Sequence, residues 1–114
     1  MEDCVFCKIA RHEIPAQIVY EDDDVVAFKD LKPVAPLHIL VIPKKHVAGI
    51  ASLADEDAAL MGRMLLAVKK LAKETDAAGD GFRVVVNQGE KAGQSVLHVH
   101  FHMLAGRPML WPPG

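Results

Sequence analysis

The hydrophobic positions of the chain follow two kinds of spacing, and each kind predicts a different secondary structure. Helical spacing covers residues 4–14, where Pro15 ends it because proline cannot continue a helix. It returns in a long stretch from Ser52 to Gly79, whose apolar residues recur three or four positions apart as Leu60, Met64, Val68 and Leu71. Strand-like runs of alternating or continuous apolar residues cover five segments: 17–22, 25–31, 37–42, 82–87 and 96–104.

The ends of these elements carry their own signals. The acidic turn Glu21–Asp24 joins the first two strands as a hairpin, and Pro43 ends the third. Ser52 with Asp55 three residues later resembles a capping box at the start of the long helix. Gly79 is typical of a helix end.

The order of elements is one short helix, three strands, one long helix and two strands. Strands this close together in sequence mostly pair antiparallel, so we expect an α+β sandwich with the helices on one face of the sheet. A chain of 114 residues is the size of one domain with a real core, which predicts a single domain over 1–114.

Composition narrows the classes of function. Hydrophobic residues make up 51% of the chain and charged residues 25%, and the formal net charge of −2 offers no basic surface for nucleic acid. No signal peptide or apolar run long enough to span a membrane is evident. We therefore expect a cytoplasmic protein with no membrane or nucleic-acid partner.

The most distinctive motif is "HVHFH", in which His98, His100 and His102 alternate with apolar residues. In a strand these three side chains share one face, while Val99 and Phe101 point to the other. Neighbours two apart are separated by roughly 6.6 Å, so the outer imidazoles lie roughly 13 Å apart. One metal ion cannot take all three as ligands, and at least one histidine needs another role.

The two cysteines form a second motif, Cys4-x-x-Cys7. In a reducing compartment this spacing is typical either of a metal site or of a redox pair. A redox pair of the thioredoxin kind needs a preceding strand, and this pair stands almost at the first residue.

Several stretches together resemble one known family. The motif "HVHFHML", the segments "EIPAQIVYEDDDVVAFKDLKPVAPLHILVIPKKH" and "VVVNQGEKAGQSVLHVHFHMLAGR", and the terminal "WPPG" are similar to the histidine triad (HIT) proteins. These stretches resemble the Hint branch specifically, the purine nucleoside phosphoramidases. This resemblance implies the HIT fold, a mostly antiparallel five-stranded sheet with one long and one short helix. It also implies a homodimer that joins two sheets into one of ten strands.

The resemblance also implies an activity, an adenosine 5′-monophosphoramidase-like hydrolase. Its nucleophile would be His100, which attacks the α-phosphorus to form a covalent nucleotidyl-histidine that water cleaves to release a nucleoside monophosphate. His102 and His38 match the positions that support this histidine and face the phosphate, where an imidazolium would offset charge and could protonate the leaving amine. Substrates would be purine nucleoside 5′-phosphoramidates, with acyl-adenylates as further possibilities, and catalysis needs no cofactor.

The remaining family positions bind substrate or metal. Asp30 matches the carboxylate that accepts hydrogen bonds from the ribose hydroxyls. An apolar purine slot and a set of polar contacts to the phosphate and the rest of the pocket are implied at Phe6, Ile9, Phe28, Leu31, Leu40, Asn87, Gly93, Gln94 and Ser95. Trp111 would influence substrate choice from the partner subunit. Some relatives hold a structural zinc ion at positions that match Cys4, Cys7, His46 and His98, a closed set of four ligands.

Two other functions remain open from the sequence. The chain could hydrolyse dinucleoside polyphosphates, as the related Fhit branch does. It could also be a nucleotide-binding regulatory or scaffold protein. A nucleotidyl transferase is disfavoured, because the uridylyltransferase relatives have glutamine where this chain has His102.

Overall fold

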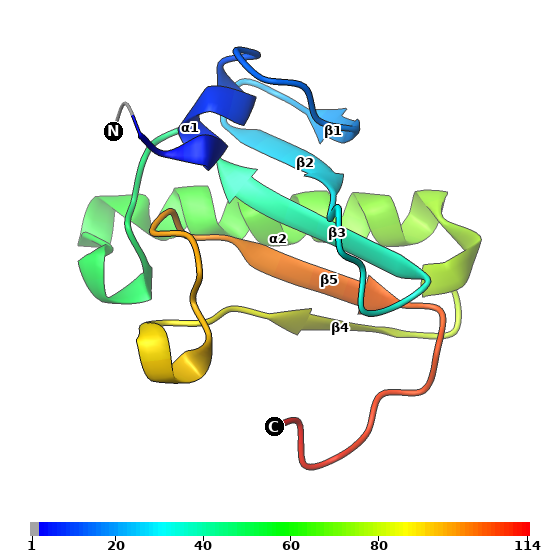
Figure 1. Ribbon diagram of the computed structural model, residues 1–114. Coiled ribbons are helices and arrows are strands. Elements are labelled where there is room, and N and C mark those ends of the chain that lie inside the picture. The colour runs from blue at the N-terminus through cyan, green and yellow to red at the C-terminus, as the bar shows by residue number, and fades with distance from the viewer. Residues whose placement is uncertain (1–2) are drawn as a thin grey trace.

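The computed structural model describes residues 3–114, and all seven predicted helices and strands are present in it (Figure 1). Short 3₁₀ helices lie in the connections. The elements follow in the order α1 (Val5–Ala10), β1 (Ile18–Glu21), β2 (Val25–Lys29), β3 (Leu37–Pro43), α2 (Ala58–Glu74), β4 (Phe82–Val85) and β5 (Phe101–Ala105).

The strands form one antiparallel five-stranded sheet in the order β1-β2-β3-β5-β4. In its register, Leu40 of β3 lies opposite Phe28 of β2 on one side and His102 of β5 on the other. Directly opposed residues of neighbouring strands point to the same face of a sheet. The last histidine of the motif therefore shares a face with two residues of the predicted purine slot.

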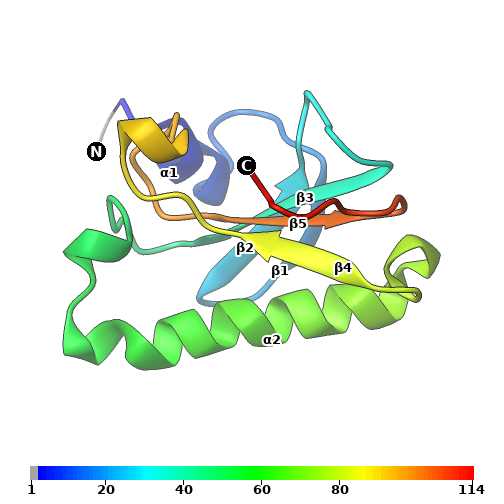
Figure 2. The ribbon, with the colours of Figure 1, turned by 90° about the horizontal axis from the view of Figure 1, so that it is seen from below.

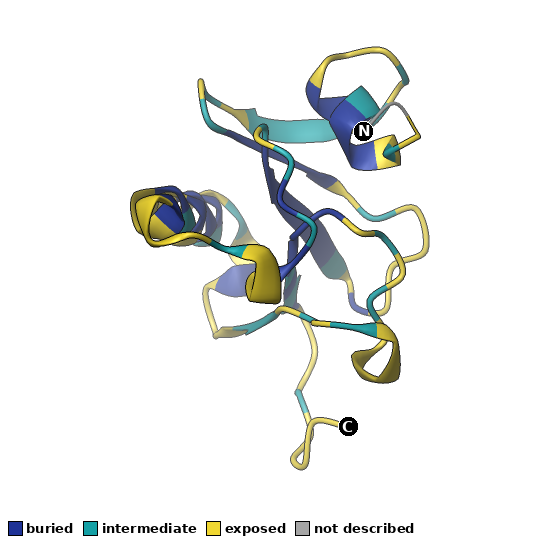
Figure 3. Cartoon of the chain, turned by 90° about the vertical axis from the view of Figure 1, so that its left-hand side faces the viewer, coloured by how far each residue is buried: buried dark blue, intermediate teal, exposed yellow. Residues whose placement is uncertain are grey.

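The two helices cover opposite faces of this sheet, with α2 below it and α1 above it in Figure 2. The prediction that both helices lie on one face is therefore wrong. Every residue of β2 except Lys29 is buried, and so is most of β3 (Figure 3), so apolar side chains point to both faces and each face needs a cover. Met64 of α2 packs on Ile39 and Met103, whereas Phe6 of α1 packs on the other face.

The long helix is shorter at both ends than the sequence signals indicate. Its start is Ala58, and the predicted capping box at Ser52 does not form. Asp57 stands at the N-cap position of α2 without a side-chain bond into the helix, and its carboxylate accepts hydrogen bonds from the Ala54 N–H at 2.9 Å and from Lys45 Nζ at 2.6 Å, in the 3₁₀ helix before α2. At the other end the helix stops at Glu74, well before Gly79.

The last strand is shorter than predicted. It begins at Phe101 rather than at residue 96, and the preceding residues form an irregular segment that the Val99 N–H ties to the Val47 carbonyl at 2.6 Å. Val99, Phe101 and Met103 are buried. His98 and His100 are buried as well, with 0% and 5% of their surfaces exposed, so they do not line an open surface.

Over residues 3–114, no helix combines the length and the apolar character that crossing a bilayer requires.

Candidate functional site

Five of the six histidines form a continuous row on the face of the sheet that carries α1. The ring centroids of His46 and His98 are 5.0 Å apart, those of His100 and His102 5.0 Å, and those of His102 and His38 5.2 Å. The backbone carbonyl of His98 accepts a hydrogen bond from the His100 ring, which links the pair of His46 and His98 to the three histidines His100, His102 and His38. The row thus divides into two sites that share one short segment of chain.

His100 has a defined tautomer. Its Nδ1 lies 2.7 Å from the carbonyl oxygen of His98, and a carbonyl can only accept a hydrogen bond. The ring proton of the neutral imidazole is therefore on Nδ1, and the lone pair is on Nε2. Phe6 packs edge-on against the ring at a centroid distance of 5.1 Å. His100 is thus a fixed imidazole with one basic nitrogen available for chemistry.

His38 and His102 form a hydrogen-bonded chain with an equally defined direction. The Val34 N–H donates to His38 Nδ1 at 3.2 Å, so the proton of neutral His38 is on Nε2. That Nε2–H donates to His102 Nδ1 at 2.9 Å and also lies 3.4 Å from Asp30 Oδ2. His102 must then carry its own proton on Nε2, which leaves an N–H donor at the end of the chain.

Burial keeps this pair neutral. The pKa of His102 is lowered to about 4, first by burial and then by charge repulsion from His100 and His38, while Asp30 acts in the opposite direction. Burial also lowers the pKa of His38, against the raising effect of Asp30. At neutral pH the low pKa of His102 favours its neutral form, which presents an N–H dipole in the free protein.

The predicted purine slot is a real cavity of about 200 Å³ between α1 and the sheet. All five apolar residues assigned to it, together with Asp30, line its walls: Phe6, Ile9, Phe28, Leu31 and Leu40. Sequence reasoning missed Pro15, Ala16 and Gln17, which line the same cavity from the connection between α1 and β1. Phe6 joins this cavity to the histidines, since its ring also packs edge-on against Phe28 at 5.5 Å.

The loop before the histidine motif is held by Gln94. Its Oε1 accepts from the Gly89 N–H at 2.9 Å, and its Nε2 donates to the carbonyls of Ala48 and Val96. The amide is thus engaged within the protein and shapes the loop. Gly93 has a φ of +90°, a conformation that favours glycine, and ends a short 3₁₀ helix.

The other predicted contacts stay predictions. Asn87 follows β4 and is half-buried, Ser95 is exposed near Cys4 and His46, and Trp111 is 82% exposed in the tail after β5. The Trp111 ring lies 6.0 Å from the Arg83 guanidinium of β4 and not at the histidines of its own chain.

The predicted metal ligands converge from three distant parts of the sequence. One ligand atom each from Cys4, Cys7, His46 and His98 lies within 4.8 Å of all the others. The Sγ of Cys7 is 3.2 Å from His46 Nδ1 and 3.5 Å from His98 Nδ1, and the two Nδ1 atoms are 3.2 Å apart. Ligand atoms around a tetrahedral zinc ion with these donors stand about 3.3–3.8 Å from one another.

The tautomer of His98 supports the same conclusion. Its Nε2 lies 2.8 Å from the Pro43 carbonyl and must donate to it, so the Nδ1 that faces the cysteines carries a lone pair. A backbone acceptor behind a histidine is the usual support for a metal ligand. The four residues therefore could bind a metal ion such as zinc.

Comparisons with known proteins agree with this geometry. The family profile of the HIT domain matches residues 11–109. A HIT-like protein of Synechocystis is 52% identical over 113 residues, which cover 99% of this chain and 98% of that protein. The protein HitA of Neisseria gonorrhoeae is 49% identical over 96% of this chain and 100% of its own length.

Solved structures agree as well. A HIT family hydrolase from Legionella pneumophila superposes with a TM-score of 0.95 at 48% identity, over 98% of this chain and 100% of that one. A histidine triad protein from Clostridium difficile superposes with a TM-score of 0.93 at 47% identity, over 96% of both chains. The chain belongs to the HIT family.

Proposed function

We propose that the protein is a hydrolase of the Hint branch, which cleaves the P–N bond of purine nucleoside 5′-phosphoramidates through a covalent intermediate on His100. The observation that carries this proposal is the set of tautomers. The His98 carbonyl leaves His100 Nε2 with a free lone pair, and the chain from Val34 through His38 leaves His102 with an outward N–H. A nucleophile and a hydrogen-bond donor thus stand side by side.

The cavity under α1 suits the base of such a substrate. At about 200 Å³ it is smaller than the roughly 300 Å³ at the lower end of typical ligand pockets, so one flat base fills it and the phosphate stays outside. Asp30 stands at its wall, where its carboxylate would accept hydrogen bonds from the ribose hydroxyls. It also accepts from the Lys32 N–H at 2.8 Å, which fixes its orientation.

The phosphate would lie between the histidines and the loop that Gln94 shapes. The His102 Nε2–H and donors around Gly93 and Ser95 would contact the non-bridging oxygens. A neutral donor array binds a phosphate without the desolvation that a buried imidazolium would cost. Once the phosphate is bound, its negative charge raises the pKa of His102.

The reaction then has two steps. The lone pair on His100 Nε2 forms a bond to phosphorus while the P–N bond breaks, and the leaving nitrogen takes from His102 the proton that this imidazole acquired from solvent when the phosphate bound. The His98 carbonyl keeps its hydrogen bond to Nδ1–H and stabilises the positive charge on the phosphorylated ring. Water next attacks phosphorus and gives one proton to the now neutral His102, the P–Nε2 bond breaks, and the nucleoside monophosphate leaves His100 in its neutral form.

The metal site would have a structural role. With four protein ligands, a zinc ion has no open position for substrate, so we propose that it stabilises the attachment of α1. That helix carries Phe6, which lies between the two cysteines in sequence, and Ile9, which lies two residues after the second. Both side chains line the base cavity. Zinc would thereby hold one wall of the substrate site.

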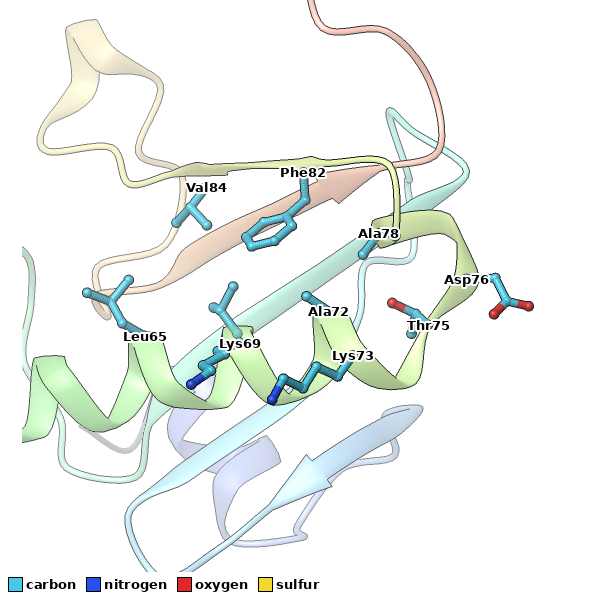
Figure 4. Close-up of a pocket in the computed structure, with 11 residues that line it drawn as sticks. Leu65, Lys69, Ala72, Lys73, Thr75, Asp76, Ala78, Phe82 and Val84 are labelled. Atoms are coloured by element: carbon cyan, nitrogen blue, oxygen red, sulfur yellow. The ribbon is translucent and has the colours of Figure 1, made fainter.

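A second copy of the chain would complete the molecule. β4 is one of the two edge strands of the sheet, and a cavity of about 660 Å³ separates its apolar residues from α2 (Figure 4). Leu65 of α2 is 53% exposed there and Phe82 of β4 is 43% exposed. Antiparallel pairing of two β4 strands would cover these side chains and join two sheets into one.

The test of the function is a direct comparison of substrates. Purified protein should hydrolyse an adenosine 5′-phosphoramidate of a primary amine and release AMP, much faster than it hydrolyses diadenosine triphosphate. Preference for diadenosine triphosphate would instead assign the protein to the dinucleoside polyphosphate hydrolases. Tight AMP binding with no turnover of either compound would indicate a regulatory nucleotide-binding protein.

A further inference from the structure

Arg107 lies outside the histidine motif, in the turn that follows β5, yet it contacts the loop between β2 and β3 that leads to His38. Its Nε donates to the Val34 carbonyl at 3.0 Å, and its Nη1 donates to the Pro108 carbonyl at 3.0 Å. The turn after β5 and the loop after β2 lie side by side in Figures 1 and 2. Residues 73 positions apart in the sequence are thus joined by one guanidinium.

The backbone of the turn is built for this approach. Gly106 has a φ of +94°, and a Cβ added to it would stand 2.8 Å from the Cβ of Pro36. Only glycine lets the chain turn this tightly over the loop. Among the described residues, the ion pairs do not include Arg107, although Asp76 and Asp80 line the same surface cavity. The guanidinium is therefore directed at a carbonyl.

Val34 is the link between Arg107 and the site. Its carbonyl accepts from Arg107, and its N–H donates to His38 Nδ1. The carbonyl and the N–H of Val34 belong to two different peptide groups, so Arg107 acts on the N–H by fixing the position of residue 34, which holds the N–H toward His38. Val34 is exposed and lies in a loop between two prolines, which leaves few other contacts to hold its N–H in place.

We infer that Arg107 is a positioning residue for the proposed reaction: through Val34 it fixes the tautomer of His38 and hence the direction of the hydrogen-bond chain that ends at His102. When the Val34 N–H is no longer held toward Nδ1, either nitrogen of His38 can carry the proton, and only Asp30 Oδ2, 3.4 Å from Nε2, still favours the Nε2–H form. His102 then loses a fixed donor at Nδ1, and its own Nε2–H is present in only part of the molecules. The inference rests on the proposed function for its catalytic consequence, but the tautomer itself belongs to the free protein.

Nuclear magnetic resonance of histidine ring nitrogens tests the inference without substrate. In wild-type protein labelled with ¹⁵N, His38 should give one protonated and one unprotonated ring nitrogen, with a coupling across the hydrogen bond from the Val34 nitrogen to His38 Nδ1. Arg107→Met keeps the apolar stem and removes the donors, and it should move the two His38 shifts toward each other. Arg63→Gln removes an exposed guanidinium of α2 that lies 3.7 Å from Asp24, and it should leave the two His38 shifts unchanged.

The kinetic expectation follows from one weakened hydrogen bond. Arg107→Met should lower kcat for the phosphoramidate about threefold to tenfold, with little change in KM. Wild-type shifts at His38 in folded Arg107→Met would overturn the inference, and so would the absence of the Val34–His38 coupling in wild type. A protein that has no phosphoramidase activity but shows the tautomer change would refute the proposed function and leave the role of Arg107 intact.

Discussion

The buried, neutral state of His102 makes the stability of the protein depend on pH in a specific way. Its pKa is about 4 in the folded chain against an ordinary value of 6.5. Between these values the unfolded chain binds a proton that the folded chain does not bind, so the free energy of unfolding falls as the pH falls through this window. Above about pH 6.5 the contribution is fully present.

The size of the effect follows from the same two values. A difference between 6.5 and about 4 corresponds to at most about 3 kcal/mol. Because the ring is half-buried and water screens part of the interaction, we expect about 1–2 kcal/mol. The groups that face His102 are His100 on its own segment, His38 on β3 and Asp30 after β2, and all of them remain when residue 102 alone is changed.

The assay compares His102→Gln with wild type. Glutamine can accept the His38 hydrogen bond but does not titrate. When the pH is lowered from about 7 to about 4.5, the free energy of unfolding of the variant should therefore fall by about 1–2 kcal/mol less than that of wild type. Urea unfolding followed by far-ultraviolet circular dichroism measures this, since Trp111 is too exposed to report on the core. His12→Asn, at an exposed histidine paired with Glu21, is the matched control. Equal losses in wild type and His102→Gln would refute the assignment of a buried neutral His102.

Three further predictions follow from the proposed site, the metal ligands and the sheet edge. His100→Ala should abolish turnover while leaving the unfolding midpoint near wild type, and surviving activity would rule out His100 as the nucleophile. Cys4→Ser should release zinc in elemental analysis and cost at least about 2 kcal/mol of stability, whereas metal-free wild type of equal stability would contradict a structural ion. Phe82→Glu should convert a dimer into monomers in sedimentation, while the same change at exposed Leu97 should not, and a dimeric Phe82→Glu would exclude β4 as the interface.

The sequence predicts most of this fold because local patterns decide most of it. Continuous apolar runs identify β2 and β3, whereas the register that places His102 opposite Leu40 is known only from the structure. The predictions that are wrong concern contacts between residues far apart in the sequence. The segment before α2 is held by the ion pair between Lys45 and Asp57, a contact that no local sequence signal indicates.

The prediction of a strand over residues 96–100 is wrong for a related reason. Residues 96–100 look like strand, but the His100 ring binds the His98 carbonyl and occupies an acceptor that a strand would need for pairing. The tautomers also depend on backbone groups, the Pro43 carbonyl and the Val34 N–H, which no pattern of side chains reveals. Sequence thus identifies the chemical groups of the site, whereas their protonation requires the three-dimensional structure.

The central claim is that His100 attacks phosphorus through the nitrogen that the His98 carbonyl leaves free. Rapid quenching of the reaction with an adenosine 5′-phosphoramidate, followed by mass spectrometry of proteolytic fragments under conditions that preserve P–N bonds, measures it most directly. We predict an adenylyl group on His100 that forms and decays within a single turnover. An adduct on another residue, or complete turnover with no adduct in the quenched samples, would contradict the account.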